Sequence, residues 1–348
     1  MTDYGQRRER LLSLAPGKQV AALTPANVFW LTGFWGGGAA IALPDRTVVV
    51  TSPLEADRAR ETGKEVEVVV AGTWKEVPEA LMERVAKGPL VADDDSLLRG
   101  TAGVTMDPTL FLNARRTKDA GEVDRIRKAS AGLDRVFREI PEIIRPGRTE
   151  WQAAAEVMKI ATGEGLTPSG SDSALSPVIV ASGENGALPH SELTSRKFRS
   201  GDFVVVDIFF RHQGYNSDST RTFAVGTVNG GMKKNYAAVR EAQEAALDVA
   251  VDGEACERVH LAAVHVLRRH GVDKYLNHSV GHGVGIDIHE LPSIARGNKL
   301  KLERNDVVTD EPGVYLSGKY GVRIEDTLVV GRRPTVLTRF TKDLVTCG

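Results

Sequence analysis

The residues of this sequence best suited to chemistry are carboxylates and histidines in its second half. Asp207 and Asp218 lie eleven residues apart in two β-rich runs that a short turn joins. If His212 and Gln213 are the central residues of that turn, Asp207 faces Asp218 directly on one side of a hairpin. Directly opposed Cβ atoms lie about 4.5–5.5 Å apart, and like charges at that distance destabilise a sheet unless a cation lies between them. Two ordinary carboxylates, or a register shifted by a bulge, are the alternatives.

Histidines gather further along the chain. His282 has a glycine on each side, and glycines let a backbone and a ligand approach closely. His278 and His289 stand nearby, so three of the eight histidines fall within twelve residues. His260 and His265 lie instead in a helical pattern, where the ordinary interpretation is a packed helix residue. The cluster around His282 is therefore the candidate for ligand binding.

Two glutamates follow in strand-like surroundings. Glu311 opens a Glu-Pro-Gly sequence, where a strand would end in a turn. Glu325 lies in a β-rich run in which Val322 and Ile324 share one face, which leaves Arg323 and Glu325 on the other. That fragment alone favours an exposed Arg–Glu pair on the surface.

The five candidate ligands have a consistent chemistry when they are taken together. Four carboxylates and one imidazole carry a formal charge of −4, which two divalent cations balance: Asp207, Asp218, His282, Glu311 and Glu325. Oxygen-rich ligation favours Mn²⁺ over thiolate-loving Zn²⁺, with Co²⁺ or Zn²⁺ as alternatives. Two metals about 3.5–4 Å apart can share a water, lower its pKa and polarise a scissile carbonyl. The pattern therefore predicts a two-metal hydrolase.

Composition excludes several other classes of function. The chain has 348 residues, with 45 basic and 46 acidic side chains and a net charge of −1, so nucleic-acid and membrane binding are not expected. Its two cysteines, Cys256 and Cys347, lie far apart, which indicates a reducing compartment and a cytoplasmic protein. The charged residues 1–13 do not resemble a signal peptide, and the apolar runs are strand-sized.

The elements that must position these residues fall into two parts. The first part alternates five β-rich runs with helical segments, which predicts a small α/β domain: the runs are Gln19–Leu23, Ala39–Leu43, Thr47–Thr51, Val66–Val70 and Leu90–Ala92. Pro44-Asp45 predicts a hairpin turn. The pattern loosens near 101–117, and we expect the domain boundary there.

The second part reads as two successive halves, each made of two helices followed by strands. A long amphipathic helix begins after Asp119, and Thr149 with Gln152 predicts the capping box of a second helix. Further helices are expected at 233–251 and 254–270. This order predicts an internally duplicated α+β domain.

The motifs around the candidate ligands resemble those of the pita-bread metallopeptidases, which include methionine aminopeptidase, prolidase and aminopeptidase P. The resemblance covers about residues 117–340, and the ligand order Asp, Asp, His, Glu, Glu is that of the family. The matching motifs are Gly214-Tyr-Asn-Ser-Asp-Ser-Thr-Arg-Thr222, Gly281-His-Gly283, Glu311-Pro-Gly-Val-Tyr315 and Arg323-Ile-Glu-Asp-Thr327. The resemblance implies a creatinase-like α/β domain over residues 1–116 and a duplicated catalytic pita-bread domain over 117–348. Phe209 and Asp310 depart from the family pattern.

The resemblance also implies roles for the site residues. Asp207 and Asp218 would hold the metals, His282 and Glu311 would bind the second metal, and Asp218 and Glu325 would bridge or flank the pair. Glu311 would also carry a proton. Residues expected to position substrate or handle protons are His190, His278, His289 and Arg323.

The Ser-Asp-x-Thr-Arg-Thr form of the second motif and the extra N-terminal domain resemble prolidase and aminopeptidase P. The implied reaction is hydrolysis of an Xaa-Pro bond by a hydroxide that bridges the metals. The short chain with one compact N-terminal domain favours the dipeptidase, prolidase; the alternative is aminopeptidase P, which acts on longer peptides. A non-catalytic binding module of the same fold is a further alternative. The expected partners are a small peptide with proline second and a second copy of the chain, in a homodimer.

Overall fold

The structure is a computed structural model that describes residues 3–169 and 176–348. Clustering of contacts divides the chain into two compact units, Met1–Arg116 and Thr117–Gly348. We propose that the two units are the two domains, with the boundary between Arg116 and Thr117.

The first unit is built on a six-stranded mixed sheet in the order β4-β3-β2-β1-β5-β6. Its strands are β1 (Gln19–Ala22), β2 (Gly38–Ala42), β3 (Thr47–Thr51), β4 (Val66–Val70), β5 (Leu90–Ala92) and β6 (Val104–Met106). All five β-rich runs of the sequence are strands. The Pro44-Asp45 turn joins β2 to β3 and is closed by a hydrogen bond from Leu43 N to Arg46 O.

The helices of the first unit were harder to predict than its strands. They are α1 (Tyr4–Leu14), α2 (Pro25–Thr32), α3 (Ala56–Thr62), α4 (Val77–Met82) and α5 (Thr109–Arg116). Helical patterns near 54–62 and 77–87 predicted α3 and α4, but no pattern predicted α1 and α2. The stretch 101–117, in which we expected the domain boundary, contains β6 and α5. Helix α2 has Pro25 in its first turn and ends at Gly33 with φ 76°, signals of a helix start and stop.

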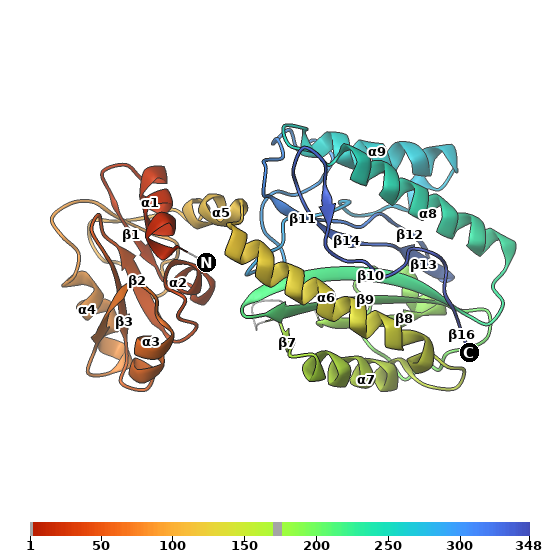
Figure 1. The fold of residues 1–348 in the computed structure, drawn as a ribbon, viewed down its shortest axis with the longest axis horizontal. Coiled ribbons are helices and arrows are strands. Elements are labelled where there is room, and N and C mark those ends of the chain that lie inside the picture. The colour runs from red at the N-terminus through yellow and green to blue at the C-terminus, as the bar shows by residue number, and fades with distance from the viewer. Residues whose placement is uncertain (1–2, 170–175) are drawn as a thin grey trace. The chain divides into compact units, whose positions relative to one another are not determined.

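The second unit begins with two long helices. Helix α6 (Ala120–Ile143) starts at a capping box formed by Asp119 and Glu122, and α7 (Glu150–Gly163) starts at the predicted capping box of Thr149 and Gln152. The apolar faces of both helices pack on one face of the central sheet (Figure 1). Helix α6 is long, but no described helix is long and apolar enough to cross a membrane.

The rest of the second unit completes a layered α+β arrangement. Helices α8 (Gly230–Val249) and α9 (Cys256–Arg269) pack over the later strands in a second apolar cluster (Figure 1). The strands are β7 (Thr167–Pro168), β8 (Val178–Ser182), β9 (Phe203–His212), β10 (Tyr215–Val225), β11 (Val307–Asp310), β12 (Gly313–Leu316), β13 (Tyr320–Arg323), β14 (Asp326–Val329), β15 (Thr335–Val336) and β16 (Thr346–Cys347). The two halves each contribute two helices followed by strands, as predicted.

The register of the β9–β10 hairpin differs from the predicted one. Asp207 is opposite Thr220, and Asp218 is opposite Phe209, so the two aspartates do not face each other directly. The central turn residues are Gln213 and Gly214 rather than His212 and Gln213, and both have positive φ, 49° and 86°. A two-residue turn of this kind needs positive φ at both central positions, which Gly214 adopts without strain.

The β-rich run that carries Glu325 is not one continuous strand. It is divided into β13 and β14, with Ile324 and Glu325 between them. Strand β13 pairs with β12, whereas β14 pairs with β11. The chain therefore changes sheets at Glu325.

Candidate metal centre

Asp207 and Asp218 lie on neighbouring strands and on the same face of the sheet. Asp207 is opposite Thr220, and Asp218 precedes Thr220 by two residues, so the two carboxylates are diagonal neighbours. Both are buried, with 8% and 6% of their surface exposed. Asp207 and Asp218 are therefore neighbours, as predicted, although the register differs. The shift is two residues, and side chains two residues apart lie on the same face of a strand.

Glu325 joins the aspartates because its backbone is tied to β10. Its N–H donates to the carbonyl of Thr220 over 3.0 Å, and its Oε2 accepts from Thr220 Oγ1 at 2.7 Å. Arg323 and Glu325 are each only 2% exposed. The interpretation of Arg323 and Glu325 as a surface pair was therefore wrong. The chain changes sheets at this point, and both side chains point into the interior of the unit.

His282 is held with one ring nitrogen directed at the carboxylates. Its Nδ1 lies 3.0 Å from the carbonyl of Gly283, and a carbonyl only accepts, so Nδ1 carries the proton. The Nε2 lone pair then faces Glu311 Oε1 at 3.5 Å and Asp218 Oδ2 at 3.8 Å. Burial lowers the pKa of His282 to about 3, which keeps the ring neutral. A neutral imidazole with its other nitrogen fixed by a carbonyl is a typical metal ligand.

The glycines beside His282 are required by close packing. A Cβ at Gly281 would lie 2.1 Å from the carbonyl oxygen of Thr309, and a Cβ at Gly283 would lie 2.1 Å from that of Leu291. The backbone of this segment therefore contacts β11 and the following loop at distances that exclude a side chain. This explains the glycines on both sides of the histidine.

The negative charges of the buried carboxylates are unfavourable unless protons or cations neutralise them. The pKa values of Asp218, Glu311 and Glu325 are all raised, first by burial and then by the neighbouring carboxylates. One oxygen each of Asp207 and Asp218 is buried without a hydrogen-bond partner among the described residues. Ligand atoms of Asp218, His282 and Glu325 lie within 4.8 Å of one another. This donor set fits divalent cations, which would both neutralise the acids and satisfy the unpaired oxygens.

Arg323 is the one guanidinium embedded in this set of candidate residues. It donates to Asp207 Oδ2 (2.5 Å), Thr220 Oγ1 (3.0 Å), Tyr315 Oη (2.8 Å) and the carbonyl of Pro189 (3.2 Å). Burial of these contacts gives the planar fork a fixed orientation. Arg323 thus orders Asp207 and reaches the segment that carries His190.

Tyr315 is a site residue to which the sequence analysis assigned no role. Its hydroxyl accepts from Arg323 and lies 2.9 Å from Nε2 of His278. Since Nδ1 of His278 faces the carbonyl of Ser279, Nε2 is the acceptor and Tyr315 is the donor. Burial lowers the pKa of His278 to about 4, so this ring is neutral. The signal in the sequence was the position of Tyr315 at the end of the Glu-Pro-Gly-Val-Tyr motif.

The two remaining histidines are more exposed. His289 packs edge-on against His282, with ring centroids 4.3 Å apart. His190 is near enough to lower the pKa values of both His278 and His289 by charge repulsion, although burial is the larger cause for each. The structure therefore brings all the predicted site residues into one neighbourhood, with His190 and His289 on its accessible side.

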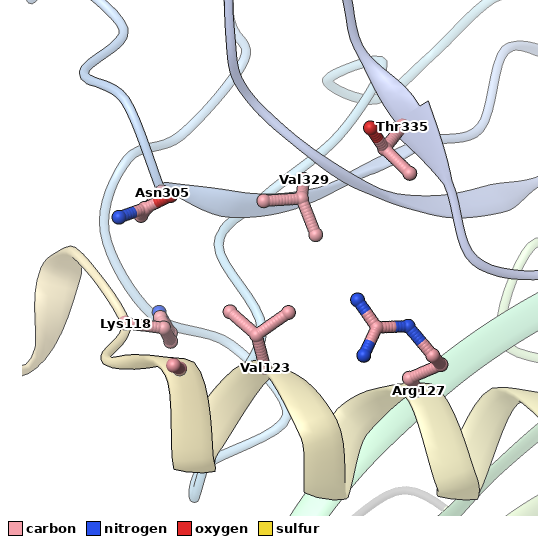
Figure 2. Close-up of a pocket in the computed structure, with 7 residues that line it drawn as sticks. Lys118, Val123, Arg127, Asn305, Val329 and Thr335 are labelled. Atoms are coloured by element: carbon pink, nitrogen blue, oxygen red, sulfur yellow. The ribbon is translucent and has the colours of Figure 1, made fainter.

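Two cavities of the second unit lie apart from the candidate ligands. Figure 2 shows the first, about 330 Å³, between α6 and β14, lined by Lys118, Val123, Arg127 and Val329 among others. The second, about 640 Å³, lies beside α9 and has His278 in its wall. None of the five candidate metal ligands lines either cavity.

Comparison with known proteins places this arrangement in a family. Residues 124–332 match the model of metallopeptidase family M24, and residues 7–134 match that of the creatinase/prolidase N-terminal domain. The chain belongs to metallopeptidase family M24. The predicted fold, an α/β creatinase-like domain followed by a pita-bread domain, is thereby confirmed.

The chain is similar to several proteins described as dipeptidases or aminopeptidases. The chain is 41% identical over 217 residues to a protein of Mycobacterium tuberculosis described as "Probable dipeptidase PepE", but the match spans only 56% of that protein's length. It is 31% identical over 325 residues to the "Xaa-Pro dipeptidase" of Pyrococcus furiosus, covering 88% of each. The structure of an "X-Pro aminopeptidase" from Thermotoga maritima superposes with a TM-score of 0.89 at 26% identity, covering 99% of this chain and all of that one.

Proposed function

We propose that this M24 protein is an Xaa-Pro dipeptidase that hydrolyses the peptide bond before proline with the help of two divalent metal ions. The observation that carries the proposal is a cluster of buried or nearly buried carboxylates beside a neutral histidine. Asp218 and Glu311 face Nε2 of His282, and Glu325 lies in the same group of ligand atoms. Similarity to an Xaa-Pro dipeptidase along most of the chain supports the substrate class.

The proposed ligands divide between two cations. Asp207 and Asp218 would hold one, His282 and Glu311 would hold the other, and Asp218 and Glu325 would serve both. Two bound cations lower the pKa of a shared water and polarise a scissile carbonyl. The predominance of oxygen ligands favours Mn²⁺, with Co²⁺ or Zn²⁺ as alternatives.

The protein's own side chains prepare the substrate. Glu311 accepts a proton from the attacking water and passes it to the nitrogen of the departing proline. His190 and His289, on the accessible side, orient the substrate carbonyl and carboxylate. Arg323 fixes Asp207 and, through Tyr315, orients His278, which burial keeps neutral. Proline suits such a site because its nitrogen has no hydrogen to donate, so recognition has to rest on the carbonyl and the chain ends.

An aminopeptidase P activity is the second candidate, and the likeness to the Thermotoga maritima structure favours it. The two activities differ in whether the site accepts residues beyond proline. A non-catalytic binding module is the third candidate, and the presence of all five candidate ligands argues against it.

The proposal is tested by supplying Mn²⁺ to the purified protein and comparing turnover of Ala-Pro, Ala-Pro-Ala and Ala-Ala. A dipeptidase hydrolyses Ala-Pro much faster than the other two. Faster hydrolysis of Ala-Pro-Ala would establish the aminopeptidase instead. Failure to cleave any of them, in protein shown to bind metal, would favour the binding module.

A further inference from the structure

The segment that carries His190 has little regular structure and an exposed tip. Residues 183–194, which we call the His190 segment, follow β8 and contain a short 3₁₀ helix, Gly183–Ala187, and no other regular structure. At its tip Leu188 is 60% exposed and His190 is also exposed. The 3₁₀ helix itself is closely packed, since Gly186 and Ala187 are buried. The exposed tip beyond it depends on polar contacts to hold a side chain in place.

The anchor at the base of the segment is Glu150, the first residue of α7. Its side chain is completely buried, with 0% of the residue exposed. One carboxylate oxygen accepts from Ser182 N (2.8 Å) and Ser182 Oγ (2.7 Å). The other accepts from Thr194 N (3.1 Å) and Thr194 Oγ1 (2.6 Å). Glu150 therefore holds together the two residues at which the His190 segment leaves and rejoins the fold.

Further contacts complete this base. Asn185, inside the segment, donates to both oxygens of Glu150 at 3.1 Å. Arg196 donates to Ser182 Oγ at 2.8 Å and forms an ion pair with Asp202. Among the described residues no cationic side chain pairs with Glu150, so its charge is stabilised by hydrogen-bond donors and by the N-terminus of α7.

The tip of the segment is tied to the metal centre by a different residue. Arg323 donates to the carbonyl of Pro189, directly before His190, and also to Asp207. The segment is thus fixed at its base by Glu150 and near its tip by Arg323. Loss of the Glu150 hydrogen bonds would leave the ion pair of Arg196 with Glu184 and the packing of the 3₁₀ helix at the base, and the Arg323 contact near the tip. We therefore expect His190 to be held less firmly rather than released.

We propose that Glu150 is a positioning residue for His190: by clamping Ser182 to Thr194, it holds the imidazole where the substrate binds. The inference rests on the proposed function, in which His190 orients the substrate. Glu150 itself belongs to no metal site and lies at the start of a helix. Its effect on turnover therefore passes through the His190 segment.

The test is a double-mutant cycle between Glu150→Gln and His190→Ala, with Ala-Pro turnover and bound metal as measurements. Glu150→Gln keeps the shape of the side chain but replaces one carboxylate oxygen with an amide NH₂ group. This group cannot accept hydrogen bonds from the donors that face Glu150. In the wild-type background we expect kcat/KM to fall about tenfold to a hundredfold with unchanged metal content. In the His190→Ala background the same change should cost less than about twofold, since the residue that Glu150 positions is already gone. Equal losses in both backgrounds would overturn the proposal.

Two further variants keep the test informative. Glu156→Gln alters a half-exposed glutamate on the same helix that pairs with Lys159, and it should leave turnover unchanged. Thr194→Val removes one hydroxyl donor and keeps the backbone bond, so it serves if Glu150→Gln does not fold; it should produce the same non-additive pattern at smaller size.

Hydrogen–deuterium exchange gives a readout independent of the reaction. In Glu150→Gln, amides of residues 183–194 should exchange faster while those of β9 and β10 stay protected. Unchanged exchange in the segment would contradict the clamp even if the protein cleaves Ala-Pro. Faster exchange in a protein that cleaves no Xaa-Pro peptide would uphold the clamp and reject the proposed function.

Discussion

Arg323 and Asp207 form a buried ion pair in which Nη2 lies 2.5 Å from Oδ2, although 116 residues separate them in the chain. The pair leaves Oδ1 as the buried oxygen of Asp207 without a hydrogen bond. One fixed positive charge beside four carboxylates still leaves the cluster negative. The cluster therefore combines an ion pair that orients Asp207 with the net negative charge that attracts divalent cations.

Asp218 and Glu325 are the residues proposed to serve both metals. Replacing either with alanine should lower turnover of Ala-Pro to below about a tenth of wild type and reduce bound metal. One missing carboxylate leaves too little negative charge to balance both cations. Metal is measured by mass spectrometry after gel filtration. Asp248→Ala, an exposed acid on α8, is the control and should change neither quantity. Near wild-type turnover in both site variants would refute the two-metal assignment.

The histidines should separate into ligands and substrate-handling residues. His282→Ala should weaken metal binding, since its Nε2 faces Glu311 and Asp218. His190→Ala and His289→Ala should keep the metal but lose about 10²–10⁴-fold in turnover, the range for a lost proton-handling group. Metal content and kcat measured on the same samples check this division. Loss of metal in His190→Ala would show that its role is misassigned.

Chelation should destabilise the protein, and more strongly at higher pH. The folded-state pKa values of Asp218, Glu311 and Glu325 are raised, so protonation favours the metal-free fold. Its stability is greatest below the ordinary carboxyl pKa, about 4, and falls as pH rises through the raised values. Bound metal adds about 2.7 kcal/mol when free metal is a hundred times its Kd. The drop in Tm on adding EDTA should therefore grow between pH 5 and pH 8.

The Asp207→Asn, Asp218→Asn double variant provides the control for chelation. It lacks two of the four carboxylates, so its Tm should respond much less to EDTA. A wild-type Tm indifferent to the chelator, in protein that contained metal beforehand, would contradict the prediction.

Asp310 offers a prediction about stability alone. It is 1% exposed, both its oxygens lack hydrogen-bond partners among the described residues, and it lies opposite Asp326 across β11 and β14. Burial and the charge of Asp326 raise its pKa well above the usual range. Ionisation at higher pH therefore destabilises the fold, and Asp310→Asn should stabilise the protein by about 1–3 kcal/mol near neutral pH.

Urea unfolding at several pH values checks this effect. The advantage of Asp310→Asn should increase from pH 5 to pH 8 and vanish toward pH 4, where the wild-type carboxyl is protonated. Destabilisation by the substitution at all pH values would mean that the carboxylate has a partner in solution.

The sequence predicted the strands of both units and the residue types of the site. It predicted the helices of the first unit and the register of the β9–β10 hairpin less well. Val- and Ile-rich runs fixed the strands, and the Thr149 capping box marked the start of α7. Helices α1 and α2 were missed, because the tertiary core buries residues such as Leu11 and Trp30 that have no clear period. The predicted hairpin register was wrong by one turn residue. The turn is centred on Gln213 and Gly214, which both have positive φ, and the sequence pattern did not show this.

The site shows the same division between residue type and spatial arrangement. The five candidate ligands could be named from charge and motif, but the burial of Arg323 and Glu325 could not, because it depends on the change of sheets between β13 and β14. The links from Arg323 to Tyr315 and Pro189 join distant segments. Spacing within one segment carries no information about them.

The most direct test of the account is a titration of metal-free protein with Mn²⁺ in which bound metal and Ala-Pro turnover are measured together. We predict no turnover without metal, activity that rises with occupancy to about two ions per chain, and neither binding nor turnover in Glu325→Ala. Full turnover in protein stripped of metal, or saturation with metal without any cleavage of Ala-Pro, would contradict the claim that these residues form a two-metal Xaa-Pro dipeptidase.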